Sequence, residues 1–278
     1  MIELFHTVSH ECSKITAERY STSFSSAIRM LHADLRMPVY DIYGFVRFAD
    51  EIVDTFHGFD KENLLADFKK ETYDAIKRGI SLNPILHSFQ ITVNKYNIDN
   101  ALIEAFFNSM EMDLSEKQYD ASAYNTYIYG SAEVVGLMCL YVFCNGDKVE
   151  YEKLRPSAQS LGAAFQKVNF LRDLKADHEQ LNRTYFPGVN FKNFTEEDKR
   201  IIEEDIATDL KKAYEGIVML PNKARFGVYV AYKYYLTLFK KIKSAQPEVL
   251  LQNRIRISNT FKAVILLKAG VRSSLNSF

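Results

Sequence analysis

Two carboxylates lie four residues apart in an otherwise apolar segment. They are Asp50 and Asp54, and Tyr43 and Arg47 precede them at the same helical spacing. Side chains three or four residues apart share one face of an α-helix. Two like charges on one face repel, and a hard divalent cation with oxygen ligands reverses the sign of that interaction. The stripe therefore indicates a metal site, against the alternative of an exposed acidic face with Arg47 as its partner.

A second polar stripe of similar design follows later in the chain. Gln166, Asn169, Asp173 and Asp177 are spaced three, four and four residues apart, so they also form one helical face. Two such helices facing each other would place four carboxylates at the mouth of a pocket. That arrangement is electrostatically unfavourable unless a cation binds there. The two stripes together predict a two-sided cation site.

The elements that must position these stripes are predicted to be helices. Only 11 Gly and 6 Pro interrupt 278 residues, and apolar residues recur at spacings of three and four. We expect an all-α, single-domain bundle covering residues 1–278, because no repeat or linker divides the chain. The expected helices are 24–31, 41–56, 61–78, 84–96, 101–114, 124–143, 157–180, 196–219, 223–243 and 250–271. Met37-Pro38 is expected to break the chain between the first two, and Thr195 to cap the helix that follows it.

Composition limits the kind of protein. The formal net charge is zero, which argues against nucleic acid as a partner. Cys12, Cys139 and Cys144 lack metal-type spacing and are expected to be reduced thiols of a cytoplasmic protein. The N-terminus lacks the pattern of a signal peptide, and the apolar run 134–144 is too short to cross a bilayer, so it predicts a core helix.

Ordered blocks along the chain resemble the squalene/phytoene synthase family, the head-to-head trans-isoprenyl diphosphate synthases, and in particular the bacterial phytoene synthases. The similar blocks are Tyr20 to Phe24, Tyr43 to Asp54, Tyr127 to Met138, Gln166 to Asp177 and Asn182 to Pro187. Two positions depart from the family pattern. Glu51 stands where many members have aspartate, and Asn182 stands where a glycine commonly precedes the arginine.

The resemblance implies an isoprenoid-synthase-type bundle with a central prenyl-binding cavity, and it assigns roles to residues. The implied ligands of Mg²⁺, for which Mn²⁺ could substitute, are Asp50, Asp54, Asn169, Asp173 and Asp177. The implied catalytic residues are the four aspartates of this set with Tyr43, Tyr127, Tyr185 and Tyr235. The implied substrate-binding residues are Ser21, Ser23, Phe24, Arg47, Gln166, Asn169, Arg254 and Arg256.

The reaction implied by the resemblance joins two geranylgeranyl diphosphates into phytoene. It passes through a cyclopropylcarbinyl diphosphate, prephytoene diphosphate, releases diphosphate and needs no NADPH. A squalene or dehydrosqualene synthase acting on farnesyl diphosphate is the alternative among enzymes, and a helical scaffold or assembly protein of the same fold is the alternative outside them. Arg254, Arg256 and Lys262 form a basic stripe that could bind diphosphate or anionic lipid at a membrane surface, and the oligomeric state stays open.

Overall fold

The computed structural model describes residues 1–115, 119–180, 183–189 and 193–274, without the side chains of 176–180, 259 and 271–274. Every element of the described chain is helical, which confirms the predicted all-α class. The helices are α1 (Ile2–Tyr20), α2 (Thr22–Ile28), α3 (Ala33–Asp54), α4 (Lys61–Arg78), α5 (Pro84–Tyr96), α6 (Asn100–Ser115), α7 (Ala121–Ile128), the π-helix η1 (Tyr129–Glu133), α8 (Val134–Cys144), α9 (Lys148–Gln180), α10 (Glu196–Ile217), α11 (Asn222–Lys243), α12 (Pro247–Gln252) and α13 (Asn259–Ser274).

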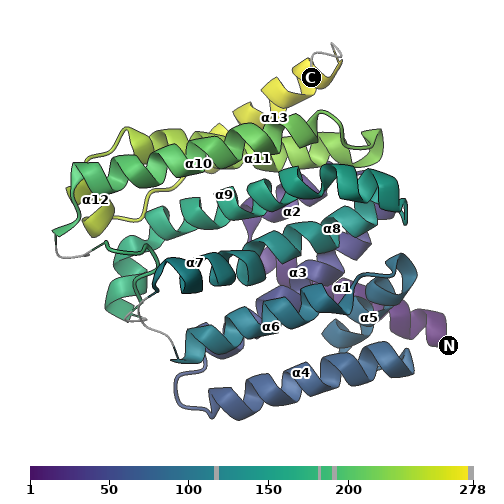
Figure 1. Ribbon diagram of the computed structural model, residues 1–278. Coiled ribbons are helices and arrows are strands. Elements are labelled where there is room, and N and C mark those ends of the chain that lie inside the picture. Colours follow the sequence, from purple (N-terminus) through teal and green to yellow (C-terminus); the bar gives the residue numbers. More distant parts are fainter. Residues whose placement is uncertain (116–118, 181–182, 190–192, 275–278) are drawn as a thin grey trace.

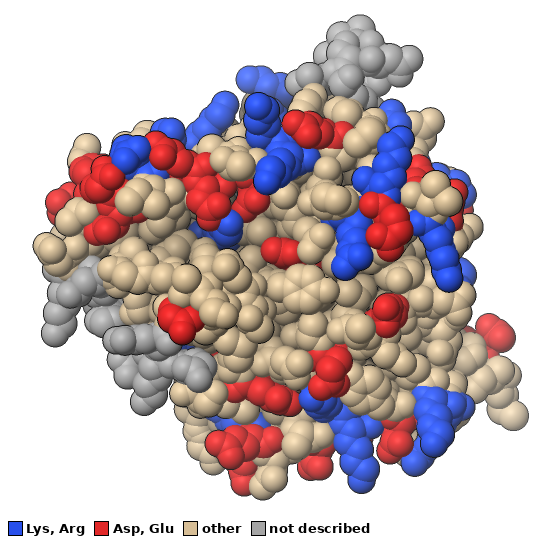
Figure 2. All heavy atoms as spheres, viewed as in Figure 1, with Lys and Arg blue, Asp and Glu red and all other residues tan. Residues whose placement is uncertain are grey.

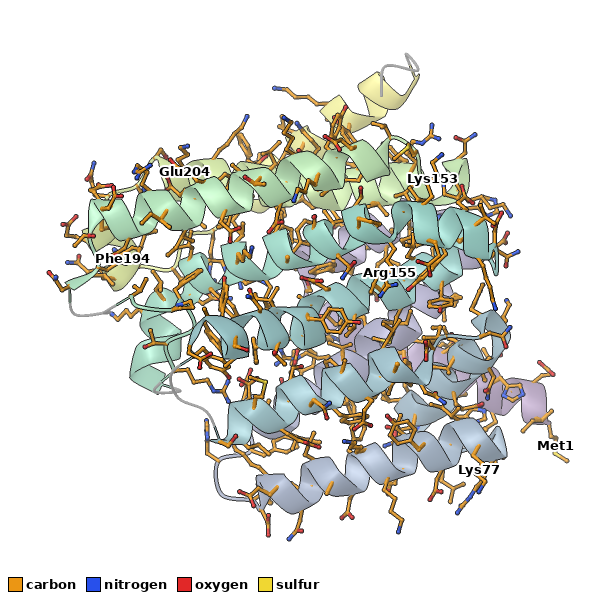
Figure 3. All side chains as sticks on the ribbon, in the orientation of Figure 1. Met1, Lys77, Lys153, Arg155, Phe194 and Glu204 are labelled. Carbon is orange, nitrogen blue, oxygen red and sulfur yellow. The ribbon has the colours of Figure 1, made fainter. Side chains whose placement is uncertain are left out.

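The helices stack from α4 at one edge to α10 and α11 near the other, with α6, α8 and α9 between them (Figure 1). Helix α3 packs on α1, α5 and α8, while α9 packs on α8, α10 and α11. The two helices that carry the polar stripes therefore share α8 as a neighbour. Side chains fill the space between the layers, with Phe194 and Lys153 near opposite ends of the molecule (Figure 3).

The centre of the bundle is the helical stretch Ala121–Cys144, which comprises α7, η1 and α8. Within the described residues it is the one stretch long and apolar enough to cross a membrane by length and composition. It packs instead against α3, α6 and α9. Val134, Leu137 and Met138 have no exposed surface. The stretch is therefore a core helix, as the sequence predicts for 134–144.

Helix α1 is absent from the sequence prediction. Its buried face consists of Ser9, Ser13 and Ala17, small residues at intervals of four. A Cβ added to Gly44 of α3 would lie 2.7 Å from the Ser13 hydroxyl, so the two helices approach closely through small side chains. Hydrophobic periodicity misses α1 because its buried stripe is small and partly polar.

Three predicted boundaries are wrong. Helix α3 runs through Pro38, its sixth residue, so this proline removes one intrahelical hydrogen bond without ending the helix. Helix α9 begins at Lys148, well before Ser157, and contains Pro156. The predicted helix 250–271 is two helices, α12 and α13, separated by the non-helical residues 253–258. By contrast, the predicted cap is confirmed: Thr195 and Asp198 form a capping box at the start of α10.

Candidate active site

A cavity of about 490 Å³ lies between the two striped helices. Its polar end is lined by Arg47, Asp50, Gln166, Asn169, Arg172 and Arg254. Its remaining lining is largely apolar and includes Ile28 and Leu31 from the α2 region, Leu140 and Phe143 from α8, and Ile217 and Leu220 from the end of α10. The cavity can therefore accept a long hydrocarbon with a polar, anionic group at one end.

Helix α3 brings the first stripe to the polar end. Asp50 lines the cavity, and its carboxylate lies 3.9 Å from the Arg47 guanidinium. Burial and the nearby Asp54 carboxylate raise the pKa of Asp50 to about 8. Asp54, one turn further, accepts a hydrogen bond of 2.7 Å from Arg183. Glu51, which stands where many members of the family have aspartate, forms an ion pair with Arg47.

Helix α9 brings the second stripe to the same end from another direction. Gln166 and Asn169 line the cavity. Asp173 accepts hydrogen bonds from two arginines, Arg172 at 3.0 Å and Arg254 at 3.2 Å, and the ion pair with Arg254 closes to 2.7 Å. The side chain of Asp177 lies outside the described residues. The structure thus brings Asp50 and Asn169 to one cavity, with Asp54 and Asp173 held beside it by arginines.

Two of the four predicted tyrosines belong to an aromatic cluster on the cavity wall. Phe165 and Tyr235 stack with ring centroids 3.8 Å apart, and Phe24 lies about 6 Å from both. Tyr43 is 6.1 Å from Phe24, and burial raises the pKa of Tyr43 to about 12. Tyr235 donates a hydrogen bond of 3.2 Å to Asn169, which connects this cluster to the second stripe.

The other two tyrosines, Tyr127 and Tyr185, lie next to each other. Tyr127 lines the cavity, and Tyr185 lies behind it with ring centroids 5.1 Å apart. Phe170 stacks on Tyr185 at 3.9 Å. Tyr185 contacts Tyr127 but does not itself line this cavity.

Residues 17–260 match the squalene/phytoene synthase family. The chain belongs to this family. It is therefore a prenyltransferase of the head-to-head type, the class that includes phytoene and squalene synthases. The fold is also found in a solved dehydrosqualene synthase in complex with a ligand, which superposes with a TM-score of 0.83 at 20% identity, covering 98% of both chains.

Individual relatives are distant. A phytoene synthase from Arthrospira platensis is 26% identical over 264 residues, which cover 86% of this chain and 84% of the relative. Chloroplastic phytoene synthase 3 from Zea mays is 23% identical over 282 residues. That alignment covers 95% of this chain and 66% of the maize protein, so the chain spans about two thirds of its length.

Of the remaining residues to which the resemblance assigns substrate binding, some line the cavity and others do not. Ser21 lines the cavity and caps α2 by accepting a hydrogen bond from the Phe24 backbone N–H. Ser23 is half-buried but outside the described lining. Arg254 lines the polar end, whereas Arg256 is exposed and its carbonyl accepts a hydrogen bond from Lys241. Asn182 lies outside the described residues.

Three polar residues at or near the cavity were not predicted from the sequence. Arg172 precedes Asp173 and falls off the polar stripe, yet it lines the cavity. Arg183 reaches Asp54 from 129 residues away. Asp113 is buried behind the tyrosines and accepts a hydrogen bond from Tyr127. The signal for Arg183 was its place beside Tyr185 in a family block, while Asp113 carried no signal in periodicity or spacing.

The donor chemistry of the site fits a hard divalent cation. No three Asp, Glu, His or Cys side chains converge into a metal cage within the described residues. Mg²⁺ commonly binds one or two carboxylates together with substrate phosphates, and the two-carboxylate stripe of α3 suits that mode. Burial and the Asp54 charge raise the pKa of Asp50, so the surrounding protein does not fully stabilise the negative charge of this carboxylate.

Proposed function

We propose that this prenyltransferase condenses two geranylgeranyl diphosphates head to head into phytoene. The observation that carries the proposal is the cavity, with arginines and acidic stripes at one end and an apolar lining beyond it. Such a shape separates the diphosphates from the prenyl tails. The similarity to phytoene synthases from a bacterium and a plant supports the choice of substrate.

The arginines would bind the diphosphates. Arg47, Arg172 and Arg254 line the polar end from three different segments of the chain. The Arg47 Nε–H is buried and has no hydrogen-bond partner among the described residues. A buried donor without a partner costs free energy until a ligand satisfies it. Guanidinium groups bind phosphate oxygens in pairs of parallel hydrogen bonds, so these residues suit a diphosphate.

The acidic stripes would hold magnesium, with Asp50 and Asp54 on one side and Asn169, Asp173 and Asp177 on the other. When bound, Mg²⁺ supplies Lewis-acid stabilisation of the charge that develops on the leaving diphosphate. The protein's own contribution is to fix the ligands: Arg183 orients Asp54, Tyr235 orients Asn169, and Arg254 orients Asp173.

The apolar wall would protect the cationic intermediates. In the first step the C–O bond of one substrate breaks, the second substrate's double bond attacks the carbocation, and loss of a proton closes a cyclopropane. In the second step the remaining C–O bond breaks, the cation rearranges, and a proton leaves to give phytoene. Carbocations are attracted to aromatic faces and destroyed by water. Phe24, Phe165 and Tyr235 offer such faces beside the polar end.

The test incubates the purified protein with Mg²⁺ and either geranylgeranyl or farnesyl diphosphate, with and without NADPH, and identifies the hydrocarbon by mass spectrometry. We expect phytoene from geranylgeranyl diphosphate, independent of NADPH. If squalene or dehydrosqualene is the main product, the substrate is farnesyl diphosphate and not geranylgeranyl diphosphate. Absence of diphosphate release from both substrates would reject the function. Chelation of the metal should stop turnover, and added Mg²⁺ should restore it.

A further inference from the structure

A buried carboxylate lies behind the cavity wall and is not explained by the ligand set. Asp113, near the end of α6, has only 3% of its side chain exposed. It accepts hydrogen bonds from the hydroxyl groups of Tyr127 at 2.8 Å, Tyr185 at 3.3 Å and Tyr119 at 3.4 Å. Arg183 lies 3.3 Å from the carboxylate and donates to the Asp113 carbonyl at 2.9 Å.

Two of these contacts lead to the active site. Tyr127 lines the cavity, so the Asp113 carboxylate sets the direction of a hydroxyl on its wall. Arg183 also donates a hydrogen bond of 2.7 Å to Asp54 of the first stripe. Asp113 itself is outside the described lining. It is thus the shared partner of a residue on the cavity wall and of the arginine that holds a predicted metal ligand.

The arrangement has a physical reason. Burying a carboxylate is strongly unfavourable unless charged and hydroxyl groups satisfy it, as Arg183 and three tyrosines do here. The planar guanidinium accommodates two carboxylates and a carbonyl in fixed directions. Removing the Asp113 carboxylate takes away one of the two carboxylates that pair with Arg183, the other being Asp54, and leaves the Tyr127 hydroxyl without its short hydrogen bond. Both changes displace groups of the site without touching the substrate.

We propose that Asp113 is a positioning residue of the condensation, which fixes the Tyr127 hydroxyl at the cavity wall and, through Arg183, the Asp54 carboxylate. The inference rests on the proposed function for its kinetic consequences. A displacement of about 1 Å in a supporting group can lower a rate by about a hundredfold. Asp113→Asn keeps the shape and removes the charge, and we expect kcat to fall by at least about tenfold with a smaller change in KM.

The chain offers a matched control for loss of a buried carboxylate. Asp41 of α3 has no exposed side chain and accepts hydrogen bonds from Thr92 at 2.7 Å and His10 at 2.9 Å. It joins α1, α3 and α5 outside the described cavity lining. Asp41→Asn should lower the melting temperature as Asp113→Asn does, yet leave kcat within about twofold of the wild type.

The hydroxyl donors provide a second control, which holds even if Asp113→Asn fails to fold. Tyr127→Phe and Tyr119→Phe each remove one hydrogen bond to the same carboxylate. We expect only Tyr127→Phe to lower kcat, because Tyr119 lies outside the described cavity lining. In the double variant Asp113→Asn/Tyr127→Phe, the two penalties should be less than additive, since both disturb one arrangement.

The experiment measures kcat, KM and melting temperature for these variants, and calorimetric binding of inorganic diphosphate in the presence of Mg²⁺. We expect Asp113→Asn, but not Asp41→Asn, to weaken diphosphate binding at least about threefold. If the wild type releases no diphosphate from either substrate, the proposed function fails, and the calorimetry still decides the inference. Wild-type kcat and diphosphate binding in Asp113→Asn, or equal effects of Tyr127→Phe and Tyr119→Phe, would overturn it.

Discussion

The two acidic stripes look alike in sequence but are held in different ways. Asp54 on α3 is bound by Arg183, whose side chain is 6% exposed and which also lies 3.3 Å from the buried Asp113 carboxylate. Asp173 on α9 is bound by its neighbour Arg172 and by Arg254, whose side chain is 49% exposed. The arginine that supports the first stripe lies inside the protein, whereas the second stripe is supported partly from the surface, by Arg254, and partly by Arg172, whose side chain is 21% exposed.

This difference sets how easily each stripe exchanges its partners. An exposed ion pair contributes at most about 1 kcal/mol, so a diphosphate can replace the contact between Arg254 and Asp173 at little cost. Removing one partner of a buried pair costs roughly 3–5 kcal/mol, because the other charge stays buried. We therefore expect the α3 stripe to be rigid before substrate binds and the α9 stripe to adjust when it binds.

The largest expected effect tests whether both stripes are needed. Asp50→Asn and Asp173→Asn should each lower kcat by about a thousandfold, because each removes electrostatic stabilisation of the leaving diphosphate. Diphosphate release and circular dichroism measure activity and fold. The control is Asp67→Asn, which changes an exposed carboxylate on α4 and should retain activity. A stripe whose variant stays active would be removed from the ligand set.

The next effect separates the stripes by stability. Arg183→Ala should lower the free energy of unfolding by roughly 3 kcal/mol, since Asp113 would remain buried without its guanidinium. Arg254→Ala should lower it by less than about 1 kcal/mol. Urea unfolding followed by circular dichroism gives both values. Equal losses would contradict the contrast between internal and surface support.

A pH dependence tests the first stripe in the absence of metal. The pKa of Asp50 is raised from 3.8 to about 8, so the folded state binds a proton more tightly than the unfolded state. Wild-type stability should then fall, relative to Asp50→Asn, as the pH rises from about 4 to 8. Melting temperatures in a chelating buffer at several pH values measure this. A constant difference between the two proteins across that range would show that Asp50 titrates normally.

The smallest effect concerns the two C-terminal arginines. Arg254 lines the cavity and contacts Asp173, whereas Arg256 is exposed outside the described lining. Arg254→Ala should raise the KM for the prenyl diphosphate by about tenfold, the loss of a charge-assisted hydrogen bond. Arg256→Ala should change kcat and KM by less than about twofold. A larger effect of Arg256→Ala would mean that the basic stripe binds substrate as a whole.

Much of the helical framework could be predicted, and the exceptions have clear causes. Helices whose buried face is mostly apolar, such as α11, are visible in the periodicity of the sequence. Helix α1 is not, because it buries Ser9, Ser13 and Ala17. The interruption between α12 and α13 was also missed, although it places Arg254 at the cavity. No glycine or proline marks the residues 253–258.

The sequence by itself determined which face of α3 and of α9 carries the polar residues, because helical spacing is a local property. Family blocks added the expected roles of those residues. Only the tertiary structure decided which side chains from distant parts of the sequence contact each carboxylate. Arg183 meets Asp54 across 129 residues, and Asp113 meets Tyr185 across 72. Such pairs depend on how whole helices pack, and no local pattern encodes that packing.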